Sequence, residues 1–186
     1  MRAQKWFHNV ILAAVLPFFL LCAAADAQTE TLDGLFDELL TADAAASQRI
    51  EQDIWREWSK SGSAAMDLLL LRGRDAMAAG DTGQAIEHLT ALIDHAPDFA
   101  EGWNARATAF YQAGEYGPSI NDIAHVLTLN PRHFGALSGL GMIFEELGKS
   151  EKALEVYRAA LAIHPHLGGV LESVERLEAA SAGQEL

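Results

Sequence analysis

Cysteine and basic side chains are both scarce in this 186-residue chain. With a single cysteine, Cys22, the chain cannot form an intramolecular disulfide. The 13 lysine and arginine residues are outnumbered by 26 aspartate and glutamate residues, which gives a formal net charge of −13 at pH 7. This balance argues against nucleic acid or anionic lipid as a partner. It favours either plain solubility or an encounter with basic partners.

The signatures of common enzymes and metal sites are also missing. The sequence contains no Walker loop, no dinucleotide-binding glycine pattern, no GxSxG nucleophile motif and no HExxH zinc motif. Acidic neighbours such as Glu145 and Glu146 point about 100° apart on a helix, so they do not form a facing acid–base pair. His164 and His166 flank a proline and lack the spacing of a helical metal-binding pair. We therefore expect no catalysis, no cofactor and no bound metal; handling of a metal or haem through histidines is the remaining alternative.

Residues 1–27 have the three parts of a secretory signal peptide. Two basic residues stand within the first five, an uncharged and mostly apolar stretch covers 10–25, and the Ala-Asp-Ala sequence ending at Ala27 supplies small residues at the cleavage positions. The apolar stretch is shorter than the ~20 residues of a membrane-spanning helix, and Pro17 interrupts it. We expect cleavage after Ala27 and a mature chain, 28–186, that is periplasmic or secreted and does not span a membrane.

Glycine and proline recur together with a period of 34 residues. The glycines are Gly80, Gly114 and Gly148, and the prolines are Pro97, Pro131 and Pro165. Glycine adopts the positive φ that a tight turn between two helices needs, whereas proline cannot continue a helix. Each unit is therefore predicted to be two helices joined by a glycine turn and ended by a proline.

Apolar and small residues keep the same register in three units, 66–99, 100–133 and 134–167. One position holds Leu69, Trp103 and Leu137, and another holds the small residues Gly73, Ala107 and Gly141, which let two helices approach closely. A single helical pair cannot bury its apolar face, but a stack of about three pairs buries a continuous core. The sequence thus predicts an all-α solenoid.

This pattern resembles the tetratricopeptide repeat, a 34-residue unit with Trp, Leu-Gly, Tyr, Ala, Phe, Ala and Pro at set offsets. Trp103 and Pro131 match in the middle unit, and Leu140-Gly141, Ala153, Ala160 and Pro165 match in the third. Arg72 and Arg106 replace the usual leucine, and their aliphatic stems can cover apolar surface while the charge reaches solvent. The resemblance spans 66–167 and implies an α-α solenoid that serves as a non-catalytic binding scaffold.

The flanking segments also show helical spacing of apolar residues. Residues 28–65 are predicted to form a helical hairpin that caps the first unit, and 168–186 a capping helix with a frayed tail from Ala180. Trp55 and Trp58 in the hairpin have two interpretations. They either pack in the core, or they dock the protein on a larger cell-envelope complex as a structural or assembly component.

The family resemblance further implies a concave groove lined by the first helix of each unit. Carried onto this sequence, the candidate groove residues are Arg74, Met77, Asn104, Thr108, Tyr111, Gln112, Ser138 and Met142. Asn104 can both donate to and accept from a peptide main chain, and Arg74 can hold a carboxylate. The Lys/Asn/Lys/Arg carboxylate clamp of chaperone-binding members is not reproduced, because only Asn104 fits it. We expect an adaptor for a protein or peptide of unknown identity; the alternative is that these are ordinary solvated helix faces.

Overall fold

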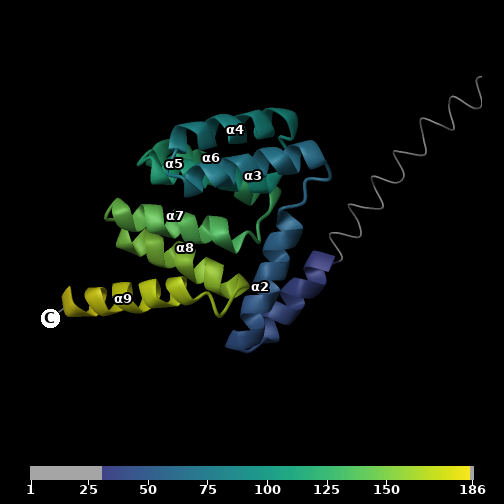
Figure 1. Ribbon diagram of the computed structural model, residues 1–186. Coiled ribbons are helices and arrows are strands. Elements are labelled where there is room, and N and C mark those ends of the chain that lie inside the picture. Colours follow the sequence, from purple (N-terminus) through teal and green to yellow (C-terminus); the bar gives the residue numbers. More distant parts are fainter. Residues whose placement is uncertain (1–30, 185–186) are drawn as a thin grey trace, which may run out of the picture.

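The computed structural model describes residues 31–184, and all regular secondary structure in that range is helical (Figure 1). A helix over residues 31–41 precedes α2 (Ala44–Trp58), α3 (Ala64–Ala78), α4 (Thr82–His95), α5 (Ala100–Gln112), α6 (Tyr116–Leu129), α7 (Phe134–Glu146), α8 (Ser150–Ile163) and α9 (Gly168–Gln184). The predicted all-α solenoid is confirmed. The predicted signal peptide lies outside the described residues. None of the described helices has the length and apolar character needed to cross a membrane.

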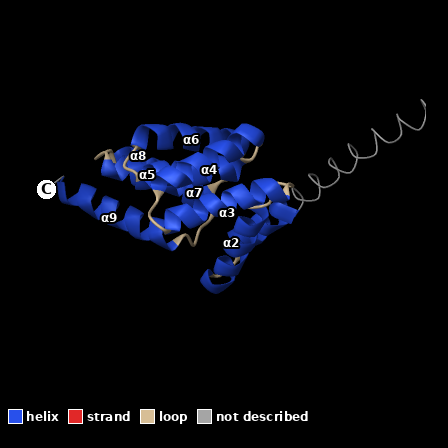
Figure 2. Cartoon of the chain, turned by 45° about the horizontal axis from the view of Figure 1, so that its top comes forward, coloured by secondary structure: helices blue, strands red, loops and turns tan. Residues whose placement is uncertain are grey.

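The three units appear as the helical pairs α3–α4, α5–α6 and α7–α8, which stack side by side (Figures 1 and 2). Each pair turns at a glycine of positive φ: 78° at Gly80, 75° at Gly114 and 68° at Gly148. At the first turn, the Gly80 N–H donates to the Met77 carbonyl (3.0 Å) and the Asp81 N–H to the Ala76 carbonyl (2.9 Å). The same two bonds recur at the other two turns. They satisfy carbonyls that the helix end leaves free, which explains why glycine stands at each turn.

Close packing within each pair depends on the small residue predicted there. A Cβ added to Gly141 would lie 2.2 Å from Cε1 of Tyr157, and one added to Gly73 would lie 2.5 Å from Cγ of Leu89. In the middle unit, the buried Ser119 hydroxyl donates to the Ala107 carbonyl at 2.7 Å. The small residues therefore let the second helix of each pair lie directly against the first.

Arg106 departs from the expectation that its charge reaches solvent. Its Nε and Nη2 donate to the two carboxylate oxygens of the buried Asp122, at 2.7 and 2.9 Å, and Nη1 donates to Thr90 Oγ1 at 3.1 Å. The guanidinium also lies over the Trp103 ring, 5.0 Å from its centroid. A bidentate ion pair between neighbouring helices replaces the apolar contact that a leucine would make.

The N-terminal hairpin is defined here as residues 31–58. It was predicted to cap the first unit, but it packs elsewhere. It crosses the edge of the stack at the α6–α7 and α8–α9 turns (Figure 1). Its Phe36, Leu39, Ile54 and Trp58 form one buried cluster with Phe134 at the start of α7, and Ile163 and Leu167 pack against that cluster. The aromatic side chains of the hairpin thus pack against Phe134. The face of α3 that the hairpin does not cover leaves Leu68 and Leu71 46% and 53% exposed.

The C-terminal helix packs on the last unit through Val170 and Leu177, both buried in a cluster with Tyr157. It extends to Gln184 instead of fraying from Ala180. Alanine-rich sequence between 179 and 182 has high helix propensity, and the Ser181 hydroxyl donates to the Leu177 carbonyl at 3.0 Å. These local factors continue the helix past its last buried residue.

Candidate functional site

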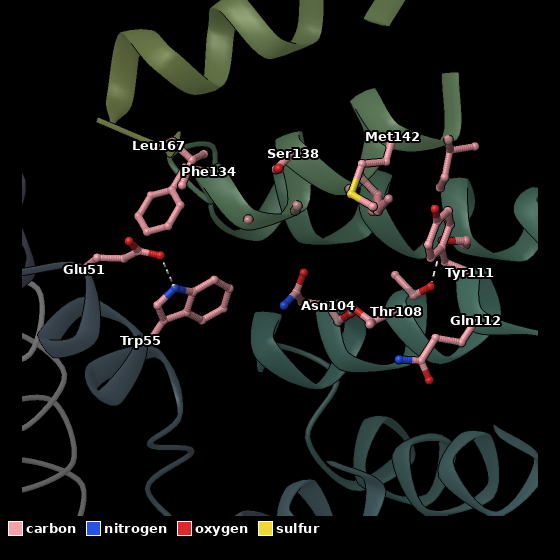
Figure 3. Close-up of a pocket in the computed structure, with 17 residues that line it drawn as sticks. Glu51, Trp55, Asn104, Thr108, Tyr111, Gln112, Phe134, Ser138, Met142 and Leu167 are labelled. Atoms are coloured by element: carbon pink, nitrogen blue, oxygen red, sulfur yellow. Dashed lines mark hydrogen bonds between the residues drawn. The ribbon is translucent and has the colours of Figure 1, made fainter. Parts of the chain in front are cut away.

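A cavity of about 390 Å³ opens between α5 and α7, with α2 across one end (Figure 3). Six of the eight candidate groove residues line it: Asn104, Thr108, Tyr111 and Gln112 from α5, and Ser138 and Met142 from α7. Trp55, Phe134 and Leu167 complete much of the apolar wall. The cavity joins the second and third units, and no residue of the first unit lines it.

Helical spacing brings the lining residues of each helix onto one face. On α5, Asn104, Thr108 and Tyr111 follow one another at intervals of four and three residues, and on α7 Ser138 and Met142 are four apart. The Thr108 hydroxyl donates to the Asn104 carbonyl (3.0 Å), which occupies its only proton. The faces of α5 and α7 thus line the cavity with apolar groups, the amides of Asn104 and Gln112, and the hydroxyls of Tyr111 and Ser138.

Gly139 keeps the α7 side of the cavity open. A Cβ added there would meet only Cδ1 of Ile123, at 3.9 Å, which is ordinary contact distance. Ile123 itself lines the cavity, so a side chain at position 139 would grow into the cavity. This glycine is the position at which the cavity can be filled with the least disturbance of its walls.

Two candidate groove residues, Arg74 and Met77, lie outside the cavity. Arg74 donates from Nη2 to Oε1 of Glu101 at 2.5 Å and from Nη1 to Oγ of Ser59 at 3.1 Å. Glu101 is only 3% exposed, whereas the Arg74 side chain is 39% exposed, so the ion pair is open to solvent on the arginine side. Met77 packs against the core of the first unit. The ion pair occupies part of the guanidinium, and the suggestion that Arg74 holds a partner's carboxylate stays a prediction.

Glu101, in the first turn of α5, organises this part of the molecule. Besides Arg74, its carboxylate accepts from Asn104 Nδ2 at 3.2 Å and contacts His133 Nε2 at 3.1 Å. His133 Nδ1 accepts the Ala136 N–H at 3.0 Å, so the ring carries its proton on Nε2 and donates it to Glu101. The repeat register did not predict the burial of Glu101, because the equivalent positions of the other two units hold Asp67 and Gly135.

Trp55 and Glu51 of α2 form the end wall of the cavity, in front of Asn104 (Figure 3). The Trp55 indole N–H donates to Glu51 Oε1 at 3.3 Å, and Glu51 Oε2 lies 3.2 Å from His164 Nε2. The hydrogen bond from His164 is the main reason that the pKa of Glu51 is lowered from its ordinary value of 4.5. Local periodicity gave no sign of this wall, because α2 and the cavity helices are far apart in the sequence.

Trp58 packs in the core, which is the first of the two interpretations given above. It stacks on the His133 ring with centroids 4.1 Å apart and an interplanar angle of 14°, and only 7% of the residue is exposed. Trp55 meets Phe134 edge-on at 5.8 Å, and a Cβ at Gly135 would lie 2.5 Å from its Cη2. Trp58 is buried, whereas Trp55 is only partly buried and lines the cavity, so docking of this segment on a cell-envelope complex stays an alternative.

Carboxylates stand at the far end of the groove as well. A second cavity of about 380 Å³ shares Tyr111, Ser138 and Met142 with the first and continues to Glu145 and Glu146. Glu145 accepts from Tyr157 Oη (2.7 Å) and pairs with Arg176 (2.7 Å). Partial burial, followed by the nearby Glu146, raises the pKa of Tyr111.

The histidines considered as metal ligands hold the hairpin instead. His164 contacts Glu51, and His166 Nε2 lies 3.0 Å from the Ala42 carbonyl oxygen. Over residues 31–184, no three His, Cys, Asp or Glu side chains are grouped closely enough to hold a metal ion. The His-Pro-His sequence thus contacts the hairpin from the connection between α8 and α9.

Comparison with known proteins places the chain in a family. The tetratricopeptide repeat model matches residues 70–124 and 119–167, and the chain belongs to this family. A TPR repeat-containing protein of Rhizobium etli is 36% identical over 161 residues, which cover 86% of this chain and 79% of that protein.

Solved structures show the same fold. The first TPR of Spaghetti (RPAP3), bound to the HSP90 peptide SRMEEVD, has a TM-score of 0.60 and 22% identity, with 63% of this chain and 95% of that chain covered. The Sgt2 TPR domain from Aspergillus fumigatus has a TM-score of 0.62 and 20% identity, with coverage of 66% and 83%. At these identities the two structures establish the architecture alone.

Proposed function

We propose that this protein is a non-catalytic adaptor that binds a segment of a partner protein in the cavity between α5 and α7. One observation carries the proposal: six groove positions from two different units converge on a single cavity of about 390 Å³. That volume is within the range of about 300–1,000 Å³ that is common for ligand sites. The peptide bound to the RPAP3 domain supports a peptide segment as the class of ligand.

The cavity lining suits a peptide. The side-chain amides of Asn104 and Gln112 can each donate and accept, as a peptide main chain requires. Tyr111 and Met142 offer apolar surface that adapts to a side chain placed between them. Recognition would thus combine main-chain hydrogen bonds with one buried apolar side chain.

The same lining disfavours acid–base catalysis. Glu51 and Tyr111 are the two titratable residues that line the cavity. The pKa of Glu51 is lowered, chiefly by His164, which weakens the carboxylate as a base, and the pKa of Tyr111 is raised, chiefly by burial, which weakens it as an acid near neutral pH. A binding role requires no proton transfer from Glu51 or Tyr111.

The test is a crosslinking pull-down from the envelope fraction with three baits: the unchanged protein, Gly139→Leu and Gly117→Leu. Leucine at 139 occupies the cavity, whereas Gly117 is exposed on α6 and its added Cβ meets nothing within 4 Å. We expect a partner that is retained by Gly117→Leu and lost with Gly139→Leu. A partner held equally by all three baits would place the binding site elsewhere.

We further propose that the protein acts outside the cytoplasm, after removal of residues 1–27. The support is the charge, apolar stretch and small-residue pattern of the first 27 residues. Mass spectrometry of the protein purified from the cell envelope should find Gln28 at its N-terminus. A chain that retains Met1 to Ala27 would contradict this part of the proposal.

A further inference from the structure

We infer that the segment bound by the cavity is cationic: an apolar side chain fills the cavity, and lysine or arginine residues beside it meet carboxylates at the two ends of the groove. This inference rests on the proposed function and specifies its ligand. It differs in charge from the acidic peptide SRMEEVD that the RPAP3 domain holds.

The first carboxylate is Glu51, at the Trp55 end. Its contacts with the Trp55 indole and the His164 ring use one lone pair on each oxygen, so each oxygen can accept a further bond. Its side chain is 30% exposed, and its lowered pKa keeps it ionised near neutral pH. A basic side chain passing over Trp55 would find a fixed negative charge at this end.

The second negative region lies past Tyr111. Glu146 is exposed and lines the continuation of the groove together with Glu145. Tyr111 lines both cavities, and Glu146 contributes, after burial, to its raised pKa. Arg176 is the cation of this region, and it is already bonded to Glu145.

No lysine or arginine lines the main cavity. Arg74, which would attract an acidic ligand, is bound to the buried Glu101. An acidic tail would therefore face Glu51 and Glu146, with Arg176 as the one lysine or arginine of the second cavity and already paired with Glu145, whereas a basic segment is attracted at both ends. Between those ends, Phe134, Leu167 and Met142 provide the apolar surface for its central side chain.

A random peptide library displayed on phage tests the inference, with selection on the unchanged protein and counter-selection on Gly139→Leu. The counter-selection is needed because a protein of net charge −13 attracts cations over its whole surface. We expect enriched sequences with lysine or arginine within two positions of a large apolar residue. Their affinity should fall about tenfold or more in Gly139→Leu, since the variant fills the centre of the interface, and should be kept in Gly117→Leu.

The charge contribution is then measured with one enriched peptide and its lysine-to-glutamine analogue. Glu146→Gln should weaken the cationic peptide by about two- to fivefold, as for an exposed ion pair, and leave the analogue unchanged. Enrichment of acidic sequences, or tighter binding of SRMEEVD, would overturn the inference but keep the adaptor function. Cationic peptides held equally by Gly139→Leu would overturn the inference, and a library with no enriched sequence would overturn the adaptor function as well.

Discussion

The repeat stack, α3 to α8, and the N-terminal hairpin are both helical, yet they are held together by contacts of different range. In the stack, Arg106 bonds to Asp122 and Thr90, each 16 residues away. In the hairpin, Glu51 reaches His164 across 113 residues, and the Ala42 carbonyl reaches His166 across 124. A repeated sequence thus builds the stack from near neighbours, whereas the hairpin depends on single side chains at distant positions.

The cavity needs both regions. The stack supplies its two long walls through α5 and α7, and the hairpin supplies the end wall through Trp55 and Glu51. We expect that release of the hairpin leaves the stack folded and removes that wall. Variants that act on one region alone can therefore separate the stability of the fold from the integrity of the site.

The largest effect is expected from Trp58→Ala. Trp58 is buried between Phe36, Phe134 and the His133 ring. Its truncation should weaken docking of the hairpin by about 3–5 kcal/mol, as for other buried tryptophans. Hydrogen exchange followed by mass spectrometry should show lost protection in residues 31–58 and retained protection in α5 to α8.

Trp58→Phe is the matched control, because it keeps an aromatic ring against His133. It should preserve most of the protection of the hairpin. Equal loss of protection in the hairpin and the stack after Trp58→Ala would mean that the two regions fold as one cooperative unit.

Gly141→Ala tests the stack in the same way and should have a smaller effect. The added methyl would overlap the Tyr157 ring, which is 1% exposed and bonded through its hydroxyl to Glu145. Overpacking of this kind costs about 1–3 kcal/mol. Urea denaturation followed by circular dichroism should show a lower midpoint for Gly141→Ala than for the unchanged protein, whereas Gly117→Ala should not lower it. Equal midpoints for the two variants would show that the α7–α8 contact accommodates the methyl group without loss of stability.

The periodic part of the fold was predictable because its determinants are local and occur three times. Gly80, Gly114 and Gly148 fix the turns, and the small residues Gly73 and Gly141 fix the helix contacts, each by a steric requirement visible in the sequence. Six cavity residues were predicted for the same reason, since helical spacing and the family resemblance place them on one face.

The placement of the hairpin was not predictable, because it depends on a steric match between Trp55 and Gly135 that no period reveals. The ion pair of Arg74 was not predictable for a related reason. Its exposure in a groove follows from its helix position, but its partner Glu101 stands 27 residues away and is itself buried by other contacts. Pairings of this kind occur once, so no second copy in the sequence points to them.

The smallest effect is expected from Glu51→Gln, and it depends on pH. The pKa of Glu51 in the folded protein is below its ordinary value of 4.5, mainly because His164 bonds to the carboxylate. The stability that this ionised contact gives to the hairpin is therefore fully present above about pH 4.5 and is lost as the pH falls through the lowered pKa. Near neutral pH, Glu51→Gln should weaken hairpin docking by about 1 kcal/mol, a value reduced by partial exposure of the side chain.

The measurement is hydrogen exchange of residues 31–58 in both proteins, near neutral pH and below the lowered pKa, with Glu155→Gln on the exposed side of α8 as the control for loss of one carboxylate. The difference between wild type and Glu51→Gln should shrink toward zero in acid, because protonated Glu51 and glutamine are both uncharged. A difference that persists unchanged in acid would show that shape and hydrogen bonding, not charge, hold Glu51 in the end wall. In that case the negative charge at this end of the cavity would be incidental to hairpin docking, and its role would lie with the bound ligand alone.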